Sequence, residues 1–161
     1  MPLALSGLSG SLTAMYSAEN DEGAAALQYA TAISSFWATG MCPFGNAVVN
    51  AAGVVSIIKP DIESMYMDKT EDAASQAKKV AATIDSAFLT LMTAGPAIQL
   101  SLSGFGKSSL EQELKGIYSG ENTAPVAAMK EAMAIMNYTI NSLVTGIIPS
   151  VPPVPVSGPI L

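Results

Sequence analysis

The sequence predicts an all-α protein, a small antiparallel helical bundle formed by residues 1–146 and followed by an extended, proline-rich arm at residues 147–161. The bundle is predicted because apolar residues recur at helical spacing in three segments. Half of the residues are hydrophobic, many of them alanine, and only 6% are aromatic, which favours close helix packing over a sheet core. The arm is predicted because five of the last 15 residues are prolines, which cannot continue a helix.

The clearest predicted helix spans residues 70–94, with Thr70 as its cap and Gly95 after its end. Two more are predicted at residues 21–39 and from residue 122 or 123 to 145, where Gly146 ends the helix. All three have an acidic start, an alanine-rich body, a bulky apolar last turn and a closing threonine and glycine. A degenerate internal repeat would give this layout, but matching helix start and stop signals alone are the preferred explanation.

Shorter elements are predicted between these helices. Residues 5–15 follow helical spacing despite two glycines, and residues 110–118 form exposed helical turns. Residues 44–58 place their apolar side chains on one helical face, although their valine and isoleucine pairs also suit a buried strand, and we choose the helix. Pro60 opens a charged connector or short helix, and residues 98–102 alternate like a strand.

The charges are segregated along the chain. All 20 lie in three patches, at residues 19–22, 59–85 and 107–131. The uncharged spans between and after these patches are long. We expect them to be buried against other protein, because a solvated helix normally interleaves charged and apolar residues. The arm alternates proline with valine, isoleucine and leucine, so it is expected to lie in a groove of a neighbouring subunit.

The composition argues against several classes of function. The net charge of -6, with seven lysines and no arginine, argues against direct nucleic-acid binding. The absence of histidine removes the commonest general base and transition-metal ligand. The single cysteine, Cys42, is interpreted as a small buried apolar residue. We therefore expect no enzyme activity, no cofactor, no metal and no small-molecule substrate.

Two alternatives remain open in the sequence. Residues Gly104–Ser108 resemble a phosphate-binding loop between a strand and a helix, but Ser101 occupies the position where that motif needs its first glycine. A glycine turn is therefore the preferred interpretation, with nucleotide binding as an alternative. The uncharged spans also suit a small membrane-associated protein, although polar residues such as Asn46 and Asn50 interrupt them.

The stretch AAALQYATAISSFWATG, the pairs Thr39-Gly40 and Thr145-Gly146, and the closing VPPVPVSGPIL resemble small helical structural proteins of tailed bacteriophage virions, especially tail, baseplate or neck components. The resemblance implies a multicopy virion subunit, assembled in the host cytoplasm, whose partners are other structural proteins and copies of itself. It carries no functional residue over to this chain.

We expect the contacts with neighbours to be made by apolar side chains in three places. These are an aromatic anchor late in the first long helix, a methionine stripe and the arm. The candidate interface residues are Trp37, Met129, Met133, Met136, Ile147, Ile148, Val151, Val154, Val156, Ile160 and Leu161.

Overall fold

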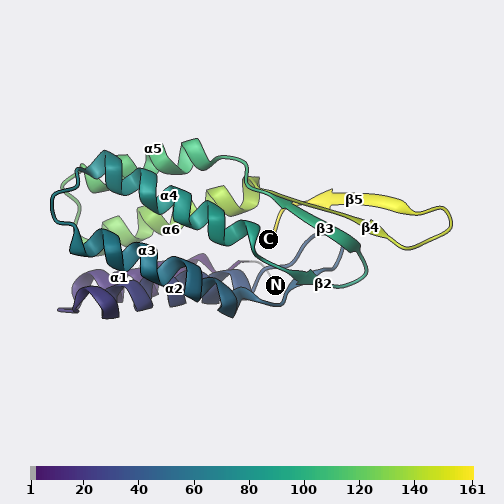
Figure 1. Ribbon diagram of the computed structural model, residues 1–161, viewed down its shortest axis with the longest axis horizontal. Coiled ribbons are helices and arrows are strands. Elements are labelled where there is room, and N and C mark those ends of the chain that lie inside the picture. The colour runs from purple at the N-terminus through teal and green to yellow at the C-terminus, as the bar shows by residue number, and fades with distance from the viewer. Residues whose placement is uncertain (1–2) are drawn as a thin grey trace.

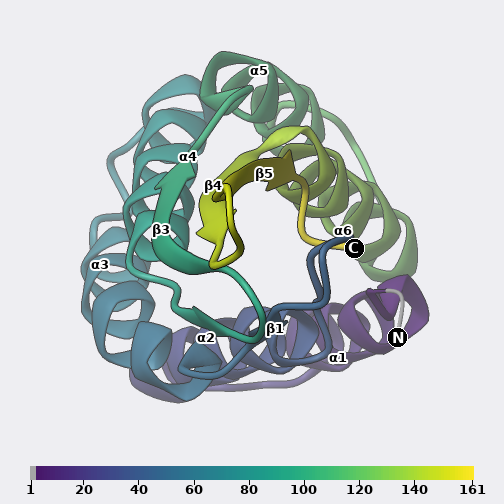
Figure 2. The ribbon, with the colours of Figure 1, turned by 90° about the vertical axis from the view of Figure 1, so that its right-hand side faces the viewer.

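The computed structural model describes residues 3–161 and contains a ring of six α-helices with short strands at one end (Figure 1). The helices are α1 (Leu5–Ser17), α2 (Glu22–Ala38), α3 (Val55–Met67), α4 (Ala73–Leu89), α5 (Lys107–Tyr118) and α6 (Ala124–Asn141), and the 3-10 helix η1 (Ala51–Val54) precedes α3. Each helix packs against its neighbours in the chain, and α6 packs against α1, which closes the ring (Figure 2). The core lies inside this ring.

The strands form two small antiparallel sheets in residues 3–161. They are β1 (Ala47–Val48), paired with β2 (Thr93–Ala94), and a second sheet in the order β3 (Ile98–Ser103), β4 (Leu143–Ile148) and β5 (Val154–Gly158). The three-stranded sheet projects beyond the helices (Figure 1). The expectation of a mostly helical protein is confirmed, while the stricter expectation of an all-α fold is wrong.

The six helices form three consecutive pairs, α1 with α2, α3 with α4 and α5 with α6, and these pairs repeat along the chain. Helices α2, α4 and α6 begin at Glu22, Ala73 and Ala124, so successive starts are 51 residues apart. The residues that pack inward keep this spacing, and all are buried: Ala26, Ala77 and Ala128; Ala30, Ala81 and Ala132; Ile33, Ile84 and Ile135. The first helices of the pairs also share buried positions, at spacings of 50 and 52 residues: Leu8, Ile58 and Leu110, and Leu12, Ile62 and Leu114. This common core supports an internal threefold repeat and not the preferred explanation by matching helix start and stop signals alone.

Local sequence signals place both ends of α2 correctly, but not the start and end of α4 or the extent of α5. The Asp21 carboxylate accepts a hydrogen bond from the Ala24 amide at 2.6 Å, and α2 follows the predicted segment closely. The cap of α4 is Asp72, which accepts a hydrogen bond from the Ser75 amide at 2.7 Å, so the prediction of Thr70 was wrong. The predicted end at residue 94 was also wrong, because α4 ends at Leu89 and residues 93–94 form β2. The segment predicted as exposed helical turns is a full helix, α5, that buries Leu110 and Leu114.

Three expectations about irregular segments need correction. Residues 44–58 are not one helix, because the chain forms β1 and η1 before α3 begins at Val55, and α3 then continues through Pro60. Helix α6 ends at Asn141, so Thr145 and Gly146 lie in β4 and do not end a helix. Pairing on both sides by β3 and β5 stabilises the extended form of this valine- and isoleucine-rich segment.

The proline-rich segment does not form a separate arm. After β4 the chain turns at residues 149–153 and returns as β5, which pairs with β4 in the same chain. Its last residue pairs with Met41, because the two backbones exchange hydrogen bonds of 2.9 Å between Leu161 and Met41. The segment was expected to lie in a groove of a neighbouring subunit, but in this structure its partners belong to its own chain, in β4 and after α2.

Candidate functional site: the uncharged end

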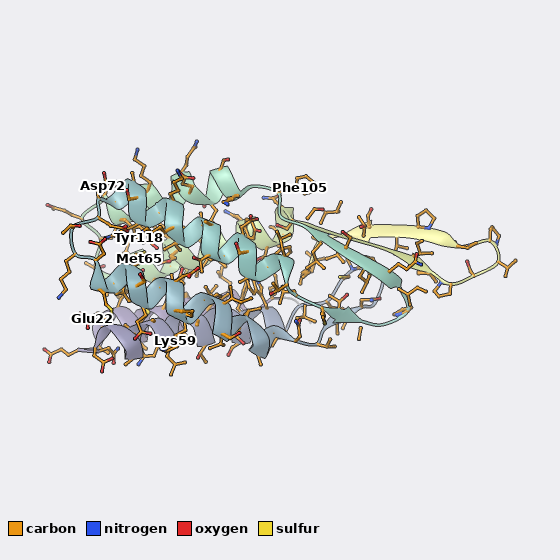
Figure 3. All side chains as sticks on the ribbon, viewed as in Figure 1. Glu22, Lys59, Met65, Asp72, Phe105 and Tyr118 are labelled. Atoms are coloured by element: carbon orange, nitrogen blue, oxygen red, sulfur yellow. The ribbon has the colours of Figure 1, made fainter. Side chains whose placement is uncertain are left out.

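The fold brings one part of each long uncharged span together at one end of the molecule. We call this the uncharged end, defined as residues 40–50, 90–106 and 142–161, which contain the strands and carry no formal charge. The loops between the helices of each pair lie at the opposite end, where Glu22 and Asp72 are seen in Figure 3. Segregation along the chain thus becomes segregation in space.

The projecting sheet has one face that is apolar along its length. Residues directly opposite each other on neighbouring strands share a face, and this face contains the pairs Leu102 and Val144, Gly146 and Val156, and Ile148 and Val154. Val144 is buried against the helices, whereas Val154 is 48% exposed. The apolar face therefore runs from the core of the protein into solvent.

The opposite face is polar only near the helices. Its row of Ser101, Thr145 and Ser157 is followed, further out, by Ile98, Ile147 and Pro155. Ile98 is 50% exposed, and Val151 in the turn at the tip is completely exposed. Large apolar side chains in solvent at the far part of a sheet are typical of a contact surface.

Both edges of this sheet are unsuited to pairing with another strand. On β3, Gln99 has a φ of 54°, and the register shifts between Ile98 and Ser101. On β5, Pro155 has no N–H to donate. Such features prevent edge-to-edge association, so a neighbour would contact the faces and tip of the sheet.

The predicted interface residues separate into three groups. In this structure Trp37 and Ile160 are fully buried within their own chain. This burial corrects the expectation that the two side chains contact a neighbour. Met129 and Met133 are 45% and 47% exposed on α6, and Met136 is partly buried. The sheet and its tip gather the remaining residues: Ile147, Ile148, Val151, Val154 and Val156, with exposed Leu161 at the end of the chain.

An aromatic cluster closes the core below the sheet. Trp37 and Phe88 pack edge to face with ring centroids 5.7 Å apart, and Phe88 packs in the same way on Tyr138 at 5.5 Å. The indole Nε1 of Trp37 donates to Thr139 Oγ1 at 3.0 Å. These residues come from the last turns of α2, α4 and α6, so they hold the ends of the three repeats together.

The glycine-rich loop at Gly104–Ser108 joins the sheet to α5. The Lys107 ammonium lies 3.7 Å from Asp85 Oδ2, and Tyr138 donates to the other oxygen of Asp85 at 2.6 Å. A Cβ atom at Gly104 would overlap both Asp85 and Tyr138. The glycine and lysine of the motif therefore have a structural explanation, the close packing of the loop against α4 and α6.

A buried carboxylate, which the sequence analysis did not single out, lies in the helical body. Glu131 of α6 is fully buried and accepts hydrogen bonds from the hydroxyls of Tyr29 at 2.7 Å, Tyr118 at 2.9 Å and Tyr16. Burial raises the pKa of Glu131 above its usual value, while the tyrosine hydrogen bonds act in the opposite direction. Tyr16, Tyr66 and Tyr118 each follow the last buried residue of the first helix in their repeat. The tyrosine at the equivalent position of each repeat was the sequence signal that could have indicated this cluster.

Cys42 is buried, and desolvation raises the pKa of its thiol to about 11, so the thiol is neutral at pH 7. Within residues 3–161, no group of three or more Cys, Asp or Glu side chains could hold a metal ion. Each helix in that range is too short or too polar to cross a membrane.

Comparisons with protein-family models, curated proteins and solved structures found no match to this chain.

Proposed function

We propose that this chain is a structural subunit of a multi-protein particle and that its uncharged end packs against neighbouring subunits. The resemblance of several sequence stretches to small helical structural proteins of tailed bacteriophages favours the virion of such a phage as that particle. The proposed partners are other structural proteins and further copies of this chain. In this proposal the chain has no catalytic role and binds no nucleic acid, membrane or small-molecule substrate.

The observation that supports the proposal is the convergence of the uncharged segments in a projecting sheet. The central part of a protein interface is depleted in charged residues and rich in apolar side chains. The far part of the sheet combines exposed Ile98, Val151 and Val154 without a charged residue among its strands. The charged end, by contrast, suits contact with solvent.

The proposal predicts that the chain is found in particles. Antibodies against it are expected to detect it at a fixed ratio to the other components in particles purified on a density gradient. Recovery of the chain only among free proteins would contradict the proposal. Flotation of the purified chain with liposomes would instead support the membrane-associated alternative.

We also predict that positive charges on the projecting sheet block incorporation. Burying an unpaired lysine in an uncharged interface costs more than ~1.4 kcal/mol, so Val151→Lys with Val154→Lys should lower the amount in particles at least about tenfold. The circular dichroism spectrum should not change, because both side chains are exposed in the free chain. Leu27→Lys, at a 46% exposed position on α2, is the matched control. Equal loss with Leu27→Lys, or normal incorporation of the double variant, would contradict the assignment of this surface.

A further inference from the structure

The C-terminal segment, residues 154–161, is the last extended segment of the third repeat. Each repeat sends one extended segment from the end of its second helix, beginning with residues 40–50, with β2 and β3, and with β4. In the third repeat the later strand folds back on the earlier one, since β5 pairs with β4, whereas in the second repeat β3 pairs with β4 and not with β2. Strand β5 and the last residues fill the slot between β4 of the third repeat and Met41 of the first.

The slot has a shape that fits this segment. Ile160 is fully buried and packs on Gly40, where even a Cβ atom would overlap its side chain. Gly158 lies opposite Val144 and against the ring of Pro43, which would be 2.9 Å from an added Cβ. Close approach at two glycines, with strand pairing along β4, makes the slot selective for the last residues of this sequence.

The connection to this segment is exposed and carries little packing. Residues 149–153 are all exposed, and they form the tip of the projecting sheet (Figure 1). The Ser150 hydroxyl bonds within the same turn, to the carbonyl of Pro152. Five extended residues reach roughly 16 Å. An exposed connection of this reach suits a hinge from which the strand could be delivered to another molecule.

We propose that residues 154–161 are an exchangeable strand, which leaves its own β4 in the assembly and fills the same slot of a neighbouring copy of this chain. The inference deepens the proposed function and rests on it. The segment makes the same contacts in the closed and exchanged forms, so the choice between them depends on the hinge and on the local concentration of copies.

Two features of the chain favour a second copy as the occupant. The slot is already complementary to this chain's own end, so exchange requires no new surface. Two copies repel each other because each chain has a net charge of -6. The segment and the slot both belong to the uncharged end, so the entry of a neighbour's strand adds no contact between like charges. The prolines limit the conformations of the free strand and reduce the entropy lost when it binds.

A pair of cysteines on opposite strands tests the exchange. Thr145 and Ser157 face each other on β4 and β5, and Cys42→Ala removes the natural thiol. One set of chains carries only Thr145→Cys, and a differently tagged set carries only Ser157→Cys. The two sets are mixed at about 1 mM, where mass action favours oligomers, and are then oxidised. We expect a disulfide-linked heterodimer well above the background from Ser157→Cys alone.

The chain with both cysteines is the folding control. Its intrachain disulfide at low concentration shows that β4 and β5 pair as described. If this control forms the disulfide but the mixed single variants stay monomeric at 1 mM, exchange is overturned. That result leaves the proposed function intact, because detection of the chain in purified particles tests it separately.

Discussion

Replacing Glu131 with alanine is expected to lower the free energy of unfolding by about 2–5 kcal/mol. The carboxylate accepts hydrogen bonds from Tyr16, Tyr29 and Tyr118. Each enclosed hydroxyl left without a partner costs about 1–3 kcal/mol, and the lost side-chain volume adds a cavity. Urea unfolding followed by circular dichroism measures this loss. Exposed Glu113→Ala is the control, with an expected change within about 0.5 kcal/mol.

The same residue gives the protein a particular pH dependence. Because burial raises the pKa of Glu131, the folded chain binds this proton more tightly than the unfolded chain does. Its contribution to stability is complete below the ordinary pKa of 4.5 and is lost as the pH rises through the higher pKa of the folded state. Asp72 acts in the opposite sense, since its pKa is lowered by the hydrogen bonds from Ser75.

Comparison with Glu131→Gln isolates this effect. The amide keeps the shape of the side chain but does not titrate, so the loss of stability with rising pH should be present in the natural protein and absent in the variant. Unfolding free energies measured from pH 4 to pH 8 give the two curves. Parallel curves would show that Glu131 does not have the raised pKa.

Replacing Trp37 with alanine is expected to lower the free energy of unfolding by about 3–5 kcal/mol. The indole is fully buried, packs on Phe88 and joins α2 to α6 through Thr139. Trp37→Phe keeps most of the ring and loses the hydrogen bond, so it should cost less. A double-mutant cycle with Thr139→Val should give a coupling energy of about 0.5–1.5 kcal/mol. A coupling near zero would contradict the hydrogen bond.

Local signals were sufficient for elements with their determinants nearby. Asp21 begins α2 and the chain leaves the helix just before Gly40, so the sequence predicts this helix to within about a residue. The alternation of Ile98, Leu100 and Leu102 predicts β3 correctly. The repeat was only suspected, because its shared core positions are mostly alanine and isoleucine, which are common in any helix of this composition.

Contacts between distant residues explain the failures. The apolar spacing of α6 continues to Leu143, but β3 and β5 pair with the next residues and make them a strand. The end of the chain looked unburied because its partners, Gly40 and Met41, lie over a hundred residues earlier. Glu131 was not recognised as a buried residue, since nothing in α6 shows that tyrosines from three other helices surround it.

Labelling at the tip of the sheet tests the central claim most directly. In a Cys42→Ala background, Val151→Cys places a reactive thiol at the tip, and Glu19→Cys places one at the charged end, where the residue is also exposed. Maleimide should label both thiols rapidly in the free chain. In purified particles we predict strong protection of Val151→Cys and unchanged labelling of Glu19→Cys. Equal labelling of the two sites in particles would contradict the claim that the uncharged end contacts the neighbours.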